Sequence, residues 1–362
     1  MLGDDRRPTP AVVGVAWFVI TGELDQVEPA RSEYAELARI VRAQGLLERR
    51  RAYYVVKIGV VVGALVVLAA LAVVVGDRWW NLAVAAGLAV VLAQLAFLGH
   101  DAGHRQICAH RRGNDLIGFV VADLLMGMSF TWWLAKHNRH HAYTNWLDKD
   151  PDLSPGALVY SSSQATARGP VGRRFARSQA LFVAPLLFLE GLNLEAASAV
   201  AVARRRDRGA VVEAVLLVAH AAVFFGGPFL VLSPVRALAF IAVSQGLFGF
   251  YLGATFLTNH VGMPTVARGD GLGFLRRQVL TSRNLSPGAV VGFLFGGLDA
   301  QIEHHLFPSM PRANLRRARA LVRPFCDEHR IHYAERSLVG AYVDVLRHLR
   351  TAGLGHSVTG LG

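Results

Sequence analysis

The chain has little cysteine and few charged side chains. Only two of its 362 residues are cysteine, Cys108 and Cys326, and only 18% carry a charge. The two cysteines are far apart and show no CxxC spacing, which argues against a disulfide framework or a thiolate metal site. The low charge and the 53% hydrophobic content exclude an ordinary soluble protein. We therefore expect an integral membrane protein.

Lysine is scarce as well. Three of the 38 basic residues are lysine, which leaves 35 arginines, and the net charge is +12. This charge suits anionic membrane lipids or an acidic protein partner. The sequence shows no nucleic-acid-binding motif and no basic stripe interleaved with aromatics, so nucleic acid is not an expected partner. The arginine bias is typical of a GC-rich bacterial genome and predicts a bacterial inner membrane.

The start of the chain shows no convincing secretory signal peptide. The apolar stretch 11–20 is short and has no clear cleavage site, so we expect this end in the cytoplasm. Within a cytoplasmic N-terminal segment, residues 1–52, we predict an amphipathic helix over 31–47. Its helically spaced apolar residues are Tyr34, Leu37, Ala38 and Val41.

Four apolar stretches are long enough to cross a bilayer, which takes roughly 20 residues. They form two hairpins, residues 53–99 and 211–259, with spans at 53–75, 79–99, 211–232 and 235–259. Arginine triplets, 49–51 and 204–206, precede the hairpins, so we expect both to begin and end on the cytoplasmic side.

Two further apolar segments, 116–134 and 181–203, contain acidic residues, and we expect them to be interfacial or buried. The regions 100–210 and 260–362 then lie at or in the cytoplasm. The predicted fold is all-α, with four transmembrane helices in two hairpins and a cytoplasmic helical cap.

Eight histidines lie just beyond the same end of the hydrophobic spans. They form three clusters and one isolated site: His100 and His104; His137, His140 and His141; His304 and His305; and His260. Positions i, i+3 and i+4 share one helix face, so each cluster can direct its rings to a common point. Eight imidazoles exceed the needs of one zinc ion and suit two metals. Imidazole accepts iron, copper, nickel or zinc, so the pattern leaves the metal open.

Polar residues near the clusters are candidates to orient a ligand or a bound water. These are Asp101, Asn259, Asp299, Gln301 and Glu303. The six remaining histidines are expected to be structural. Among them His220 is unusual, because it lies in the middle of a span, where an ionisable residue is functional by default.

Three strings carry a family resemblance: HDAGH at 100–104, HNRHH at 137–141 and QIEHHLFP at 301–308. In this order around two hydrophobic hairpins they resemble the membrane fatty acid desaturases. The third is similar to the front-end and bacterial acyl-lipid branch, and the resemblance covers about residues 53–311. It implies that the eight histidines hold two iron ions, with His260 matching an additional family ligand. It also implies that O2 is the co-substrate and that two hydrogens are removed from adjacent carbons of an acyl chain.

The resemblance also implies partners. The acyl chain would arrive on coenzyme A, a membrane lipid or an acyl carrier protein. The sequence has no HPGG motif of a fused cytochrome b5. We therefore expect a separate electron donor, a ferredoxin or a flavoprotein reductase, docking on arginines such as Arg312, Arg316, Arg317 and Arg319.

Three other functions compete with desaturation. A fatty acid or alkane hydroxylase, or a carotenoid or sterol oxygenase, would share the histidine clusters but insert oxygen. A metal or proton transporter predicts histidines inside the spans, where only His220 lies. A haem protein needs only two axial histidines per haem and leaves most of the array unexplained.

Overall fold

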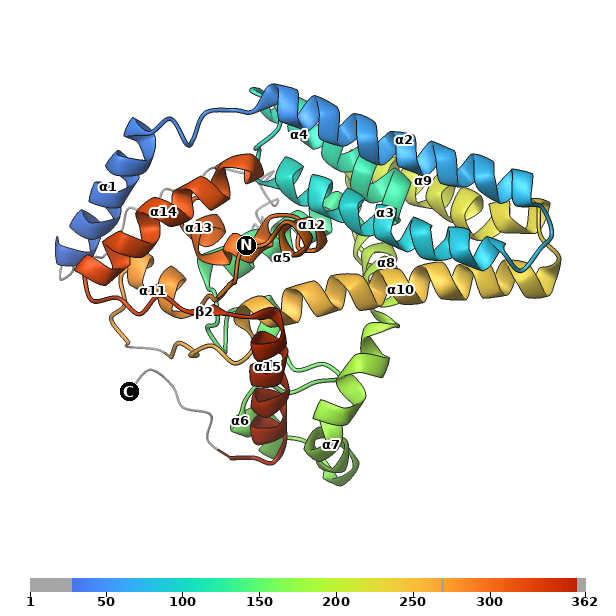
Figure 1. The fold of residues 1–362 in the computed structure, drawn as a ribbon. Helices are drawn as coiled ribbons and strands as arrows, with labels where there is room; N and C mark the ends of the chain where they lie inside the picture. Colours follow the sequence, from blue (N-terminus) through green and yellow to red (C-terminus); the bar gives the residue numbers. More distant parts are fainter. Residues whose placement is uncertain (1–27, 268–269, 357–362) are drawn as a thin grey trace, which may run out of the picture.

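The computed structural model describes residues 28–267 and 270–356, and the apolar stretch 11–20 lies outside them. The described chain is almost entirely helical (Figure 1). Its elements are α1 (Glu28–Ala43), α2 (Arg51–Val75), α3 (Asn81–Gly103), α4 (Arg111–Gly118), η1 (Phe119–Leu124), α5 (Phe130–Ala142), η2 (Pro151–Leu153), α6 (Ser162–Thr166), α7 (Pro170–Leu187), α8 (Glu190–Ala203), α9 (Arg208–Ala221), η3 (Ala222–Gly226), η4 (Gly227–Leu230), α10 (Pro234–His260), α11 (Phe274–Leu280), β1 (Asn284–Leu285), α12 (Ala289–Leu294), η5 (Leu298–Ala300), α13 (Gln301–Leu306), α14 (Arg312–Glu328), β2 (Glu335–Arg336) and α15 (Leu338–Gly353).

Four long apolar helices could cross a membrane, as the sequence predicts. They are α2, α3, the continuous segment Arg208–Leu230 and α10. Helices α2, α3 and α10 pack side by side (Figure 1), whereas Arg208–Leu230 packs on η1 and α8 and meets α10 at η4. Their most apolar windows differ in burial: 56% in α3 and 50% in α10, against 6% in α2 and 17% in Arg208–Leu230. Because lipid replaces water here, the exposed apolar helices face the bilayer, while α3 and α10 form the centre of the bundle.

The turns of the two hairpins lie together, at the ends of the spans remote from the histidines. Asn81 closes the first turn by donating its side-chain amide to the carbonyls of Ala72 (3.2 Å) and Gly76 (2.7 Å). Asp77 in that turn accepts from the backbone N–H of Ser233 (2.8 Å) and pairs with Arg236 (2.6 Å) in the second hairpin. These contacts align the hairpins, so the opposite ends of α3 and α10 meet at one level.

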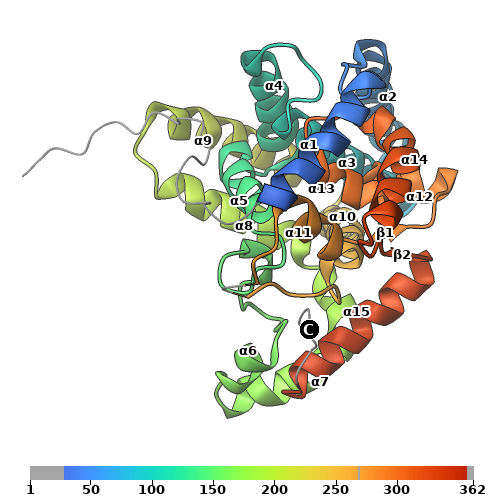
Figure 2. The ribbon, with the colours of Figure 1, turned by 90° about the vertical axis from the view of Figure 1, so that its left-hand side faces the viewer.

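A helical cap, here α1, α11, α13 and α14, covers that level (Figure 2). The helix predicted over 31–47 is present as α1, which ends at Ala43, and its Leu37 and Val41 are fully buried against the other three helices. Each such aliphatic side chain contributes about 1.5–3 kcal/mol of burial free energy. The cap therefore holds α13, which carries the third histidine cluster, firmly over the ends of the spans.

The two shorter apolar segments form bent structures rather than straight spans. Residues 116–134 run through α4, the π-helix η1 and the start of α5. Residues 181–203 lie in α7 and α8, whose axes differ by 82°, and they would supply a fifth span only if this bent pair counted as one. A Cβ on Gly249 of α10 would lie 2.5 Å from the backbone nitrogen of Gly191, so paired glycines allow α8 to touch α10.

Candidate metal centre

The eight histidines converge in two groups. Within each group one candidate ligand atom per residue lies within 4.8 Å of the others. The five-histidine group is His100, His104, His137, His141 and His304, and the three-histidine group is His140, His260 and His305. Of the histidines in the described part of the chain, the six expected to be structural belong to neither group. The division itself gives two neighbouring places for a metal ion.

Helical geometry explains how the clusters divide. In α5, His137 and His141 are four residues apart and enter the five-histidine group, whereas His140 points to the other group. In α13, the adjacent His304 and His305 likewise separate. Two short helices thus contribute to both groups, which fixes the groups relative to each other.

The ring nitrogens of the five-histidine group approach one another closely. The Nε2 atom of His137 lies 2.9 Å from that of His104 and 3.1 Å from that of His141, which lies 3.1 Å from that of His304. The Nε2 atom of His100 is buried without a hydrogen-bond partner. Two nitrogens that bind one metal at about 2.1 Å and at right angles lie about 3.0 Å apart. These residues therefore fit a transition-metal ion.

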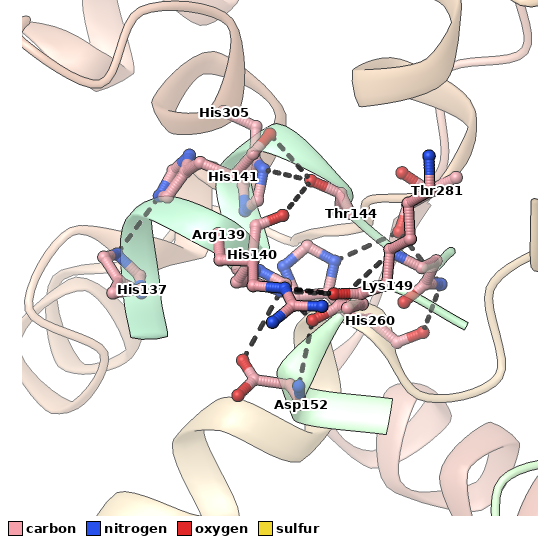
Figure 3. A network of polar contacts seen from close by, with 12 residues as sticks. His137, Arg139, His140, His141, Thr144, Lys149, Asp152, His260, Thr281 and His305 are labelled. Carbon is pink, nitrogen blue, oxygen red and sulfur yellow. Dashed lines mark hydrogen bonds and ion pairs between the residues drawn. The ribbon is translucent and has the colours of Figure 1, made fainter. Parts of the chain in front are cut away.

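Oxygen acceptors fix the tautomer of several rings. A ring nitrogen facing a carbonyl or carboxylate must carry the proton, which leaves the Nε2 lone pair for a metal. The Nδ1 atom of His140 donates to the Asp150 carboxylate (2.9 Å), and that of His260 donates to the Thr281 carbonyl (3.1 Å). The Nδ1 atom of His305 donates to Gln278 Oε1 (3.0 Å). A carboxylate oxygen of Asp101 lies 3.5 Å from Nδ1 of His100. Figure 3 shows the contact of His260 with Thr281 and the approach of His140 to Asp152.

Burial keeps most of the rings neutral. Four histidines of the five-histidine group lie outside the spans. Burial, followed by repulsion from the other histidines, holds the pKa of each well below its usual range; the four are His104, His137, His141 and His304. The same causes lower the pKa of His305. His140 differs, because the charges of Asp152 and Asp150 outweigh its burial and raise its pKa. Neutral imidazole is the form that binds a metal.

Two of the predicted orienting residues lie at the three-histidine group. The amide nitrogen of Gln301 is 2.9 Å from Nε2 of His260, and its oxygen accepts from Asn259 (3.0 Å). The side-chain amides of Gln301 and Asn259 therefore lie beside the three-histidine group, which has two imidazoles fewer than the other group.

The other predicted orienting residues lie further out. Asp101 joins His100 to a buried Arg312, at 2.6 Å from the guanidinium. Asp299 pairs with Arg316 (3.4 Å), and no contact of its carboxylate with a histidine is found in the described chain. Glu303 accepts from Tyr333 (2.6 Å) and from Asn284 (2.8 Å), which ties α13 to the segment before β2.

Sequence reasoning missed several residues that touch the clustered histidines, among them Gln278 and Thr281, described above, and three more. Asp150 is 2% exposed and accepts from His140, and Asp152 lies 3.4 Å from the same ring. Trp133 stacks on His137, with 4.6 Å between ring centroids. The signal for Trp133 was available, since it precedes His137 by one helical turn. The Asp150-Pro-Asp152 string, ten residues beyond His140, offered no helical spacing to follow.

A cavity of about 370 Å³ adjoins the histidines. Its lining includes Lys136 and Asp152, which pair at 2.6 Å and are 37% and 43% exposed. It also includes the buried Met126 and Met128, together with Leu252. Both bent segments contribute to its walls. The lining is therefore polar and partly exposed at Lys136 and Asp152, and apolar and buried at the methionines and Leu252.

Two of the four arginines expected to dock an electron donor are not available for it. Arg312 is 7% exposed and pairs with Asp101, and Arg319 is 9% exposed and donates to the Leu285 carbonyl (3.1 Å). Both lie on the inner face of α14. Arg316 and Arg317 are exposed, so these two of the four named arginines can meet a partner.

Comparison with known proteins shows which family this chain belongs to. The family model described as fatty acid desaturase matches residues 77–337. The acyl-lipid (9-3)-desaturase of Physcomitrium patens is 29% identical, with 91% of this chain and 65% of the relative aligned. The delta(8)-fatty-acid desaturase of Helianthus annuus is 29% identical over 77% of this chain and 64% of its own length. The delta(6)-fatty-acid desaturase fat-3 of Caenorhabditis elegans is 31% identical, with 73% of this chain and 62% of the relative aligned.

The chain thus spans about two thirds of the length of these relatives. The family match extends over most of the chain and includes all eight histidines, the bent segments and the cap helices α11 and α13. The chain belongs to the fatty acid desaturase family.

Proposed function

We propose that the protein is an O2-dependent fatty acyl desaturase that uses two iron ions, one in each histidine group. The observation that carries this proposal is the division of eight histidines into two groups beside an apolar cavity. Desaturation removes two hydrogen atoms from adjacent carbons and, with two electrons and two protons from a donor, reduces O2 to two waters. When bound, the iron ions would supply the O2 chemistry.

The chain's own residues bind and align the substrate. The apolar walls at Met126, Met128 and Leu252 take up an acyl tail and exclude water from it. The polar part of the lining at Lys136 and Asp152 faces the carrier, which we propose to be coenzyme A, a membrane lipid or an acyl carrier protein. His100, His137, His140 and His260 line the same cavity, so one carbon pair lies beside the metal ligands.

The surrounding residues hold the ligands. Asp150, Thr281 and Gln278 keep the Nδ1 protons of three histidines in place, and Asp101 with Arg312 supports His100. Gln301 and Asn259 contribute amide groups that can orient a bound water at the three-histidine group. These roles need no movement of the backbone.

We also propose a separate electron donor, a ferredoxin or a flavoprotein reductase. Its docking surface includes the exposed Arg316 and Arg317 on α14, the helix that packs on α13 and the third histidine cluster. The arginine triplets before both hairpins support a cytoplasmic position for the centre. The proposal of a bacterial inner membrane is supported by the arginine-rich composition alone, because the relatives named above are from eukaryotes and do not support it.

The test is analysis of total fatty acids by gas chromatography and mass spectrometry in a host that expresses the chain with a compatible donor. A new double bond is expected, and it should disappear in His304→Ala. The matched control is His329→Ala, which changes a partly exposed histidine outside both groups. A hydroxylated product would move the assignment to an oxygenase, and purified protein that binds no iron would refute the proposal.

A further inference from the structure

A network of buried and partly buried polar side chains lies within the bundle, apart from the two histidine groups. His220 of α9 is 4% exposed, and its Nδ1 donates to the Leu124 carbonyl at the end of η1 (3.1 Å). Its Nε2 lies 3.8 Å from Glu195 of α8, which accepts from the amide of Gln245 in α10 (2.6 Å). A polar network of this kind is costly inside a membrane and implies a specific role.

The helices around His220 are distorted where they meet. The π-helix η1 ends at Leu124, whose carbonyl accepts the hydrogen bond from His220. The π-helix η3 begins two residues after His220. Phe224 of η3 stacks on the imidazole, with 5.2 Å between ring centroids. Single turns of π-helix inside α-helices occur frequently at functional sites. Two of them here bracket one ionisable side chain.

The network presses directly on the segment that lines the cavity. Gly127 adopts φ +72°, and a Cβ there would lie 2.7 Å from Nε2 of His220 and 3.2 Å from the Glu195 carboxyl carbon. The residues on either side, Met126 and Met128, both line the cavity. Leu194, the neighbour of Glu195, lines it too. The network therefore packs behind the apolar part of the cavity lining.

We propose that His220, Glu195 and Gln245 form a positioning network that fixes the Met126–Met128 wall and thereby determines how far an acyl chain enters. The depth of entry selects the carbon pair that lies beside the histidines, and it limits the chain length that fits. Within the described chain, His220 contacts none of the eight clustered histidines and does not line the cavity, so it acts through the wall. The inference rests on the proposed desaturase function.

The test compares product distributions rather than total activity. Wild type, His220→Leu and Glu195→Gln are expressed with a series of saturated acyl chains, and the ratios of double-bond positions and of chain lengths are measured by gas chromatography and mass spectrometry. Each substitution is expected to change these ratios about twofold to tenfold, the range that corresponds to one neutral hydrogen bond. Met128→Ala, which alters the wall itself, should change the same ratios.

Two variants serve as controls. His220→Asn keeps a side-chain N–H that can reach the Leu124 carbonyl, so it should restore much of the wild-type distribution. His329→Leu removes a histidine far from the cavity and should leave the distribution unchanged. If His220→Leu does not fold, Glu195→Gln carries the test, because it keeps the size of the side chain.

The outcomes separate this inference from the proposed function. Variants that yield less product with wild-type ratios would show a purely structural network and overturn the inference. A wild-type protein that binds iron and receives electrons but yields no unsaturated product would overturn the proposed function instead.

Discussion

Replacing Asp150 with asparagine should weaken metal binding at the three-histidine group while leaving the five-histidine group intact. The Asp150 carboxylate accepts three hydrogen bonds: from Nδ1 of His140 (2.9 Å), from the backbone N–H of Asn145 (2.8 Å) and from that of Asp152 (2.9 Å). The two oxygens of the carboxylate share these donors. An asparagine has one acceptor oxygen, and its amide would face a donor with another donor.

The expected loss follows from this arrangement. Removing the partner that orients a metal-binding histidine lowers metal affinity 10- to 100-fold. At 1.4 kcal/mol for each factor of ten, this is about 1.4–2.8 kcal/mol. The loss should affect only the ion held by His140, His260 and His305, because no ligand of the other group contacts Asp150 in the described chain.

The assay counts iron per chain in purified, iron-loaded protein during titration with a chelator under anaerobic conditions. Asp150→Asn should release one of two ions at a 10- to 100-fold lower chelator concentration than wild type. Asp115→Asn is the matched control, since the contact found for Asp115 in the described part of the chain is an exposed pair with Arg111 (3.3 Å). Superimposable titrations of wild type and Asp150→Asn would refute the reasoning.

Three further predictions concern stability, each measured by thermal unfolding of the protein in detergent. Gly249→Ala should lower the free energy of unfolding by about 1–3 kcal/mol, because the added Cβ would overlap the α8 backbone. Gly63→Ala is the control, since a Cβ there has no neighbour within 4 Å and should not lower it. Equal unfolding midpoints for the two variants would contradict this prediction. Arg312→Gln should cost about 3–5 kcal/mol, because it leaves the buried Asp101 without its cation, and a loss no greater than that of Arg317→Gln would argue against the pair. Iron-free protein should lose stability as the pH falls below about 6.5, because the buried histidines have lowered pKa values and the unfolded chain then binds more protons than the folded one. An unfolding temperature that is the same at pH 5 as at pH 7.5 would contradict this prediction.

The four spans and the proximity of the histidine clusters were predictable because both follow from local patterns. A run of about 20 apolar residues is read directly, and i, i+3, i+4 spacing fixes a helix face. The bend between α7 and α8 was not predictable in the same way. Pro185 near the end of α7 is a local sign of a break, but the 82° angle brings Gly191 against Gly249 of α10, a segment distant in sequence.

The assignment of the arginines shows where a local pattern was available but not used. Arg312 and Arg319 are seven residues apart and share a face of α14 with Leu315 and Val322, all of them buried. Helical periodicity alone places these two arginines inward. Asp150 is different, because its contact with His140 arises from a turn after α5 that no periodic pattern describes.

The unequal burial of the spans makes the protein sensitive to helical register in only half of its membrane domain. One residue inserted into α3 would rotate all later side chains by about 100° and would turn His100 and His104 away from their partners. The same insertion in α10 would displace His260. In α2, whose most apolar window is 6% buried, an insertion after the buried Val61 would mainly change which side chains meet lipid. Insertions and deletions should therefore be tolerated in the second half of α2 and excluded from α3 and α10.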